Sequence, residues 1–287
     1  MNLLAHLKRP LRPLKKPIYA MERAYRVRFP GNLRMPDFIG IGAGQSGSSW
    51  MFKMLNCHPE VFVARKKETH YFSVKFDEWS LAYYSSLFEE GGDRVCGEIT
   101  PRYSLLVPER IEFIRKIMPD VRLLLTVRNP IDRAWSAARR VMFRYAEQQG
   151  ISIDQVADSE FYEFFEKESQ YRTIERRTAG DFVPGMLQGH YSRAIDNWTR
   201  VFPKEQLLVC FFDGIALDPE GFMRRVFQHI GVSQSVDWDS MPLRKKVNRN
   251  PTRDIPERFE AYLRELYGPE IEELQRRYGK PVDSWLS

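Results

Sequence analysis

The chain has few cysteines and no long apolar run. Among its 287 residues only Cys57, Cys96 and Cys210 are cysteines, and their wide spacing fits neither a disulfide framework nor a zinc site. We therefore expect reduced thiols and a cytoplasmic location. No apolar stretch approaches the roughly 18–20 residues that a membrane-spanning helix needs. The opening "MNLLAHLKRPLRPLKKPIYAM" also lacks the continuous apolar segment of a secretory signal.

Most of the chain also lacks an excess of either charge. The net charge is +6, but residues 1–35 hold nine Lys or Arg and one acid, which leaves 35 basic and 37 acidic residues in the remainder. A basic, proline-interrupted segment is typical of a solvated lead-in, and contact with an anionic membrane surface is the alternative. We divide the chain into a basic extension, residues 1–35, and a nearly neutral domain, residues 36–287. We expect no nucleic-acid partner.

What the domain does contain is a regular alternation of apolar segments and helical patterns. We expect strands at residues 38–43, 61–65, 94–100, 121–127 and 206–212. We expect helices at residues 48–57, 77–88, 105–118, 130–145, 152–177, 191–201, 219–230 and 256–278. Nearly continuous apolar strands separated by helices predict a parallel sheet that is covered on both faces. The expected fold is a single α/β, P-loop-like domain with a central parallel sheet flanked by helices on both faces.

A glycine- and serine-rich turn, "GAGQSGSSW", follows the first expected strand. Gly42, Gly47 and Ser49 match the outline G-x-x-x-x-G-K-[ST], but Ser48 stands at the lysine position. The most apolar strand ends in Arg128 rather than in the acid that helps a nucleotidase to hold magnesium. Backbone N–H groups of such a turn, together with a helix N-terminus, still bind an anion. The turn therefore predicts a phosphate site that needs no metal.

The stretch "TVRNPIDRAWSAARR" carries a second set of polar side chains. Arg128 ends a strand, Asn129 can cap the next helix, and Ser136 lies two turns into that helix with Arg133 and Arg140 on the same exposed face. Ligands of open α/β sheets gather at the carboxyl ends of the strands, where Arg128 and Ser136 can bind one phosphate together. A surface helix with solvated arginines is the alternative.

Four stretches occur in the order typical of one enzyme family: "GAGQSGSSW", "HPEVFVARKKETHYFS", "GEITPRYS" and "RNPIDRAWS". The chain resembles the sulfotransferases that use 3′-phosphoadenosine 5′-phosphosulfate (PAPS), in the branch of the heparan sulfate sulfotransferases and their bacterial relatives. The resemblance covers residues 37 to 285. It implies PAPS as co-substrate, no metal, and in-line sulfuryl transfer to a hydroxyl or amine of a small-molecule or glycan acceptor.

The resemblance also implies the residues that bind the nucleotide. Arg128 and Ser136 correspond to the ligands of the 3′-phosphate. The loop around the 5′-phosphosulfate corresponds to Gly44, Gln45, Ser46, Gly47, Ser48, Ser49 and Trp50. A mobile loop that closes over the nucleotide corresponds to the stretch that contains Lys245, Lys246 and Asn248.

In the block "KKETHYF", Glu68 corresponds to the general base of the family and His70 is the second catalytic candidate. Without the resemblance, Glu68 would be interpreted as an exposed glutamate and His70 as a structural histidine. We expect Glu98 and Thr100 to line the acceptor side.

The chain departs from the family at Gln45, where the 5′-phosphosulfate loop usually has a lysine. The amide of Gln45 donates hydrogen bonds but carries no charge. Either a neighbouring lysine supplies the charge or catalysis is slower than usual. The neighbours are Lys66, Lys67, Lys245 and Lys246.

Two other functions remain open. One is a P-loop nucleotide kinase, which would bind ATP with magnesium. The other is a catalytically weak or silent protein of the PAPS-binding fold, which the loss of the lysine at Gln45 makes conceivable. The joint presence of Glu68, Arg128 and Ser136 favours the enzyme.

Overall fold

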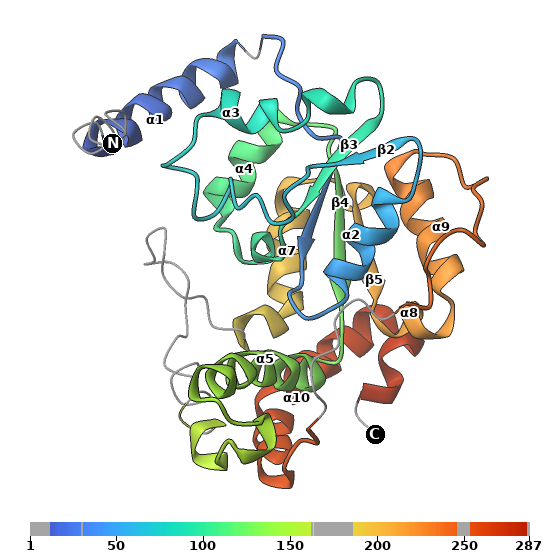
Figure 1. The fold of residues 1–287 in the computed structure, drawn as a ribbon. Helices are drawn as coiled ribbons and strands as arrows, with labels where there is room; N and C mark the ends of the chain where they lie inside the picture. Colours follow the sequence, from blue (N-terminus) through green and yellow to red (C-terminus); the bar gives the residue numbers. More distant parts are fainter. Residues whose placement is uncertain (1–11, 30, 162, 164–185, 246–252, 286–287) are drawn as a thin grey trace.

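A five-stranded parallel sheet forms the centre of the protein, as the computed structural model in Figure 1 shows. The structure describes residues 12–29, 31–161, 163, 186–245 and 253–285. The strands follow the order β2-β3-β1-β4-β5, and each pairs in parallel with its neighbours. Their bounds are β1 (Phe38–Gly42), β2 (Val61–Val63), β3 (Val95–Ile99), β4 (Arg122–Val127) and β5 (Leu207–Phe211). The single α/β domain with a parallel sheet is therefore confirmed.

Helices cover both faces of this sheet (Figure 1). The described α-helices are α1 (Arg12–Arg28), α2 (Ser48–Asn56), α3 (Leu81–Ser86), α4 (Pro108–Ile117), α5 (Pro130–Gln149), α7 (Tyr191–Val201), α8 (Asp213–Leu217), α9 (Pro219–Ile230) and α10 (Glu257–Tyr278), of which α1 lies away from the sheet. Most of them match the expected helices within a few residues. The short helix α8 was not expected. The helix expected at 152–177 starts as a 3-10 turn, Ile153–Gln155, and much of the remainder lies outside the described residues.

Alternate side chains of each strand enter two separate cores, because successive residues of a strand point to opposite faces. On β4, Leu123 and Leu125 belong to the core beneath α4, α5, α7 and α10, whereas Leu124 belongs to the core beneath α2 and α9. All five residues of β1 are buried. Burial on both faces is the reason that the strands are apolar throughout rather than alternating.

The helix α1 corrects one expectation about the basic extension. Residues 12–28 are helical, and Arg23 is 6% exposed because it lies against Phe76 and Asp77. Residues 12–28 are therefore a helix that packs on the domain through Arg23, rather than a free lead-in, while most of their described side chains are exposed as expected. The boundary at residue 35 stays a prediction. Within the part of the chain that the structure describes, no helix combines the length and the apolar character needed to span a bilayer.

Three strands bring the predicted site together. The central strand β1 lies between β3 and β4, and all three run in the same direction. The segments that follow these strands therefore meet at one edge of the sheet, which is where ligands bind in open α/β folds. The predicted nucleotide loop follows β1, and Arg128 follows β4.

Candidate functional site

The turn between β1 and α2 has the geometry of an anion-binding loop. Gly47 precedes α2 at φ 87°, in the left-handed region, and no side chain caps the helix N-terminus. A side chain at this position would collide with Ile215, because a Cβ would lie 2.5 Å from its Cδ1. The first N–H groups of any α-helix have no intrahelical partner, and the helix dipole adds partial positive charge there. The start of α2 at Ser48 can therefore bind an oxyanion.

Two buried polar atoms beside this turn lack a hydrogen-bond partner among the described residues. Among the described residues, neither the Oγ of Ser46 nor the Nε of Arg128 has a hydrogen-bond partner, and Ser46 is fully buried. Buried polar groups are ordinarily satisfied. The phosphate groups of a nucleotide would supply acceptor oxygens to these two atoms, so the residues present fit a phosphorylated ligand.

Arg128 links the end of β4 to this turn. Its Nη1 donates to the carbonyl of Gln45 at 3.3 Å, and its guanidinium lies 4.7 Å from the ring centroid of Phe212. The hydroxyl of the buried Tyr191 donates to the carbonyl of Arg128 at 2.9 Å. Burial lowers the pKa of Arg128, which still leaves the side chain protonated at neutral pH. The predicted nucleotide ligand Arg128 is thus held against the loop.

Ser136, the other residue predicted to bind the 3′-phosphate, also meets the loop. Its Oγ donates to Oε1 of Gln45 at 3.2 Å, and Ser136 is 9% exposed. The structure therefore brings the residue that replaces the family lysine together with Arg128 and Ser136. Arg133, which we expected on the exposed face of α5, is instead buried at 1% exposure.

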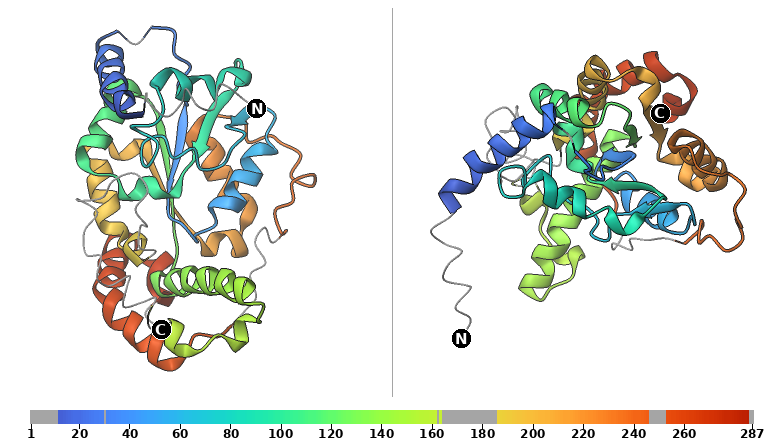
Figure 2. Two further views of the ribbon diagram at one scale, coloured as in Figure 1. Left: turned by 60° about the vertical axis from the view of Figure 1, so that its left-hand side comes forward. Right: turned by 90° about the horizontal axis from the view of Figure 1, so that it is seen from above.

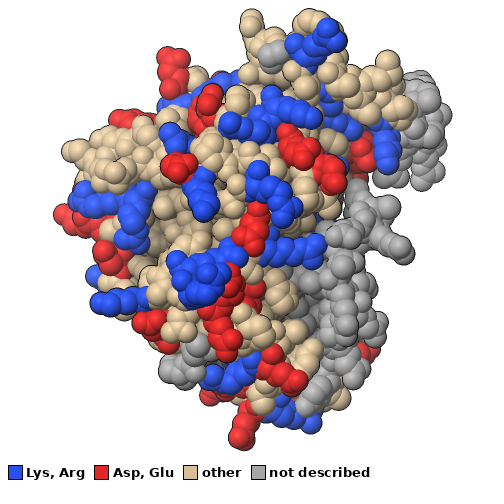
Figure 3. Space-filling model, turned by 180° about the vertical axis from the view of Figure 1, so that it is seen from behind, with Lys and Arg blue, Asp and Glu red and all other residues tan. Residues whose placement is uncertain are grey.

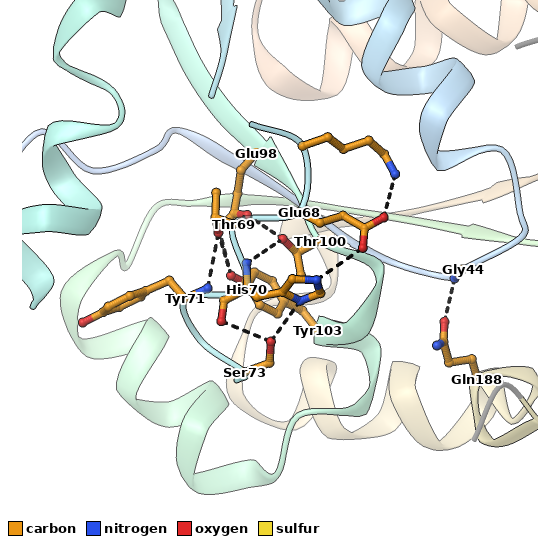
Figure 4. A network of polar contacts seen from close by, with 11 residues as sticks. Gly44, Glu68, Thr69, His70, Tyr71, Ser73, Glu98, Thr100, Tyr103 and Gln188 are labelled. Carbon is orange, nitrogen blue, oxygen red and sulfur yellow. Dashed lines mark hydrogen bonds and ion pairs between the residues drawn. The ribbon is translucent and has the colours of Figure 1, made fainter. Parts of the chain in front are cut away.

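Glu68 lies between a lysine and a histidine (Figure 4). Its Oε1 is 2.8 Å from Nζ of Lys67, and its Oε2 is 3.4 Å from Nε2 of His70. The backbone N–H of Glu68 donates to the carbonyl of Ile99, the last residue of β3. The hydrogen bond from His70, followed by the contact with Lys67, lowers the pKa of Glu68 to about 2 against the opposing effect of burial. Glu68 is therefore a carboxylate at neutral pH.

Backbone strain is concentrated in the same two loops. In the described part of the chain, the non-glycine residues with positive φ are Gln45 at 65°, Glu68 at 63° and His70 at 58°. A left-handed conformation is unfavourable for these residues and persists only where the surroundings impose it, often at functional sites. All three are residues that the sequence singled out for binding or catalysis.

A buried carboxylate supports the second strained turn. Glu98 is 1% exposed and accepts hydrogen bonds from the hydroxyls of Thr69 at 2.6 Å, Thr100 at 2.7 Å, Tyr84 at 2.7 Å and Tyr103 at 3.0 Å. Figure 4 draws Glu98 with three of these partners, Thr69, Thr100 and Tyr103. Thr69 lies between Glu68 and His70, so this network anchors the turn that carries both. Glu98 and Thr100 are both buried, and their place on the acceptor side stays a prediction.

Two further residues near the loop were not recognised from the sequence. The Oε1 of Gln188 accepts the N–H of Gly44 at 2.7 Å, which Figure 4 also shows, and Tyr191 holds Arg128. Both belong to the stretch "QGHYS", which lies outside the four stretches that carried the resemblance. Local sequence carries no signal for Gln188, because its contact with Gly44 joins residues that are far apart in the chain.

The remaining predicted residues lie around the loop or outside the described chain. The indole of Trp50 packs in the core at 5.6 Å from Phe222 and donates to the carbonyl of Leu243, which leaves only the Trp50 backbone for an anion. Lys245 is exposed at the end of a described segment. Lys246 and Asn248 lie outside the described residues, so their roles stay predictions.

Comparison with known proteins identifies the family. A model of the Sulfotransferase family matches residues 82–237, a stretch that includes β3, β4, Arg128 and Ser136. The chain belongs to the sulfotransferase family, and the resemblance to the PAPS-dependent members is confirmed.

Among its relatives is the mouse heparan sulfate glucosamine 3-O-sulfotransferase 6, which is 26% identical over 212 residues, 72% of this chain and 55% of the relative. Human heparan sulfate glucosamine 3-O-sulfotransferase 3B1 is 28% identical over 212 residues, 72% of this chain and 48% of the relative. The chain thus spans about half the length of these curated relatives.

Two solved structures share the fold. A sulfotransferase from Alicyclobacillus acidocaldarius aligns with a TM-score of 0.67 at 22% identity, over 88% of this chain and 99% of that one. Mouse sulfotransferase SULT7A1, whose structure is a complex with PAP, aligns with a TM-score of 0.50 at 15% identity, over 93% of this chain and 94% of that one.

Proposed function

We propose that this protein transfers the sulfuryl group of PAPS to a hydroxyl or amine of an acceptor. The observation that carries the proposal is the meeting of three loops at adjacent strand ends. Arg128 after β4 donates to the carbonyl of Gln45 after β1, and the N–H of Glu68 donates to the carbonyl of Ile99 at the end of β3. An anion-binding turn, a guanidinium and a carboxylate therefore share one edge of the sheet.

The nucleotide would be held by groups that have few other partners. The N–H groups at the start of α2 and the Oγ of Ser46 suit the 5′-phosphosulfate. Arg128 and Ser136 suit the 3′-phosphate, since a guanidinium and a hydroxyl both donate to phosphate oxygens. PAPS supplies the sulfuryl group and a phosphate leaving group.

Glu68 would act as the general base. The acceptor oxygen forms a bond to sulfur while the bond from sulfur to the 5′-phosphate oxygen breaks, and the electron pair of that bond stays on the phosphate. Glu68 takes the proton of the acceptor, which becomes more acidic as the new bond forms. A base in this position contributes about 10²- to 10⁴-fold to the rate.

Lys67 would replace the missing positive charge. Its Nζ is 2.8 Å from Glu68, and its side chain is 22% exposed. In the transition state, negative charge grows on the leaving phosphate oxygen, where a cation stabilises it most. If Lys67 moves toward that oxygen, the pKa of Glu68 rises, because the ion pair that lowers it is broken.

The chemical class of the acceptor is proposed by analogy with the relatives. The names of the two relatives describe sulfation of glucosamine in heparan sulfate. For this chain we propose a glycan or small-molecule acceptor with a hydroxyl or amine. The expected cytoplasmic location and the absence of a catalytic metal stay predictions.

The test combines nucleotide binding with an acceptor screen. Isothermal calorimetry should show that the protein binds adenosine 3′,5′-bisphosphate, and ³⁵S-labelled PAPS should label one of a panel of glycan, lipid and phenolic acceptors. Binding of the bisphosphate without transfer to any acceptor would support a silent binding protein. Binding of ATP with magnesium, and none of the bisphosphate, would overturn the proposal in favour of a kinase.

A further inference from the structure

The outward face of α1 is an apolar stripe. Ile18, Met21 and Tyr25 are 56%, 74% and 59% exposed, and Phe29, directly after the helix, is 53% exposed. Spacings of three and four residues place these side chains one above another along the helix. Solvent-facing positions of a helix are ordinarily polar, so this stripe requires an explanation.

The polar face of the same helix is bound to the domain. Arg23 donates to the carbonyl of Phe76 at 2.6 Å and lies 3.8 Å from the centroid of its ring. The carboxylate of Glu22 accepts the backbone N–H groups of Leu81 and Ala82, each at 3.0 Å. The polar side of α1 therefore packs against the domain, whereas an ordinary amphipathic surface helix packs with its apolar side inward. These contacts prevent α1 from turning its apolar stripe toward the core.

The stripe lies at the periphery and is continuous. Figures 1 and 2 show α1 as an outlying helix beside α3 and α4, and its end of the molecule in Figure 3 shows tan side chains next to Lys and Arg. Large exposed apolar side chains on other described elements are isolated from one another along the chain: Tyr83, Ile151, Leu217 and Tyr262. A grouped apolar surface of this kind marks a binding face, whereas single exposed side chains do not.

Positive charge flanks the stripe. Lys15 and Arg28, near the two ends of α1, are exposed, and neither forms an ion pair with another described residue. The segment 1–35 as a whole carries eight more basic than acidic residues. Basic side chains beside an exposed apolar stripe are typical of helices that lie in the interface of an anionic bilayer. The charge therefore favours lipid headgroups over a second, equally basic copy of α1.

We propose that α1 binds the surface of a membrane that contains anionic lipids. Ile18, Met21 and Tyr25 enter the boundary between headgroups and acyl chains, while Lys15 and Arg28 contact the headgroups. Because Glu22 and Arg23 bind the segment 76–82, a helix bound in this way holds the whole domain at the membrane surface. The inference does not depend on sulfuryl transfer.

Co-sedimentation of the full chain with lipid vesicles tests the proposal. We expect binding to vesicles that contain phosphatidylglycerol, weaker binding to pure phosphatidylcholine, and a decrease as salt screens the headgroup charge. The double substitution Met21→Glu and Tyr25→Glu should weaken binding at least about tenfold, since it places charge in the apolar stripe. Leu217→Glu is the matched control, because Leu217 on α8 is 82% exposed and should not contact lipid.

A fluorescent probe separates insertion from electrostatic contact. In a Cys57→Ser background, which removes the exposed cysteine, Met21→Cys can be labelled with an environment-sensitive dye. Its emission should shift to the blue on phosphatidylglycerol vesicles, and the same dye at Leu217→Cys should not respond. Unchanged vesicle binding by the doubly substituted protein would overturn the proposal. Sedimentation velocity would also overturn the proposal if it showed dimers of the unsubstituted protein and monomers of Met21→Glu. The stripe would then bind a second copy of the chain.

Discussion

Oγ of Ser136 donates a hydrogen bond of 3.2 Å to Oε1 of Gln45, so the residue that replaces the family lysine contacts a predicted ligand of the 3′-phosphate. The left-handed backbone of Gln45, at φ 65°, accompanies this contact. The two halves of the proposed nucleotide site are thereby joined through one amide. The backbone carbonyl of Gln45 also accepts a hydrogen bond from Nη1 of Arg128, which adds a second link.

Gln45→Lys should raise turnover by up to about tenfold or leave it unchanged, a difference of at most about 1.4 kcal/mol in the activation free energy. The new ammonium would lie near the oxygen that gains negative charge in the transition state. Initial-rate kinetics with PAPS measure the effect. Gln45→Met, which keeps the length of the side chain without its polar atoms, is the control. A large loss in Gln45→Lys would instead indicate that Lys67 already supplies the charge, and Lys67→Ala should then be the most damaging lysine substitution.

Arg128→Ala should weaken binding of adenosine 3′,5′-bisphosphate by roughly 10- to 150-fold, since a charge-assisted phosphate contact contributes about 1.5–3 kcal/mol. Affinity for 5′-AMP, which lacks the 3′-phosphate, should change much less. Calorimetry with both nucleotides measures the difference. Arg122→Ala is the control, because Arg122 is exposed at the opposite end of β4. Equal losses for the two nucleotides would assign Arg128 to the structure of the loop rather than to the 3′-phosphate.

Glu68→Gln should lower kcat about 10²-fold or more and leave the affinity for adenosine 3′,5′-bisphosphate nearly unchanged. The amide keeps the size of the side chain but cannot accept a proton from the acceptor. Glu78→Gln, at a carboxylate paired with Lys75 outside the site, is the matched control. Wild-type turnover in Glu68→Gln would remove the proposed base.

His70→Gly should raise the pKa of Glu68, because the hydrogen bond from His70 is the largest effect that lowers it to about 2. Glycine is chosen because His70 has φ 58°, which alanine adopts poorly. Protonated Glu68 cannot act as a base, so activity is lost as pH falls through its pKa. In the wild type kcat/KM should stay level down to about pH 4, whereas in His70→Gly it should begin to fall near pH 5, toward the ordinary glutamate value of about 4.3.

Lys67→Met should shift the same acid limb in the same direction, because the hydrogen bond and the charge of Lys67 also lower the pKa of Glu68. The measurement is a profile of kcat/KM between pH 4 and 8, about the range in which the protein should stay folded. Such a profile separates a shift of the acid limb from a lower kcat/KM at neutral pH. Identical acid limbs in all three proteins would contradict the role of Glu68 as the titrating base.

Glu98→Gln should lower the free energy of unfolding by about 1–3 kcal/mol, since one amide oxygen cannot accept all the hydroxyls that the buried carboxylate accepts. It should also lower kcat, because Thr69 would lose the contact that holds the turn between Glu68 and His70. Urea denaturation and kinetics measure the two effects. Tyr84→Phe, which removes a single donor on the same carboxylate, should destabilise less. Unchanged stability in Glu98→Gln would show that the network does not support the turn.

The alternation of apolar strands and helices was sufficient to predict the parallel sheet, because strands buried on both faces must be apolar at every position. The glycine-rich turn, Arg128 and Ser136 were recognisable for a similar reason, since each follows directly from its place after a strand. Their meeting at one edge also follows from parallel strands. These properties depend on short segments and on their order along the chain.

The burial of individual side chains and the orientation of α1 were decided by the tertiary structure alone. The burial of Glu98 depends on hydroxyls from Thr69, Tyr84 and other distant residues, and no local pattern distinguishes a buried carboxylate from one that lines a pocket. The orientation of α1 likewise depends on Phe76 and on the start of α3, which bind its polar face. Composition indicated a basic, solvated segment, whereas packing turned its apolar side outward, because the contacts that orient a surface helix come from the body it binds.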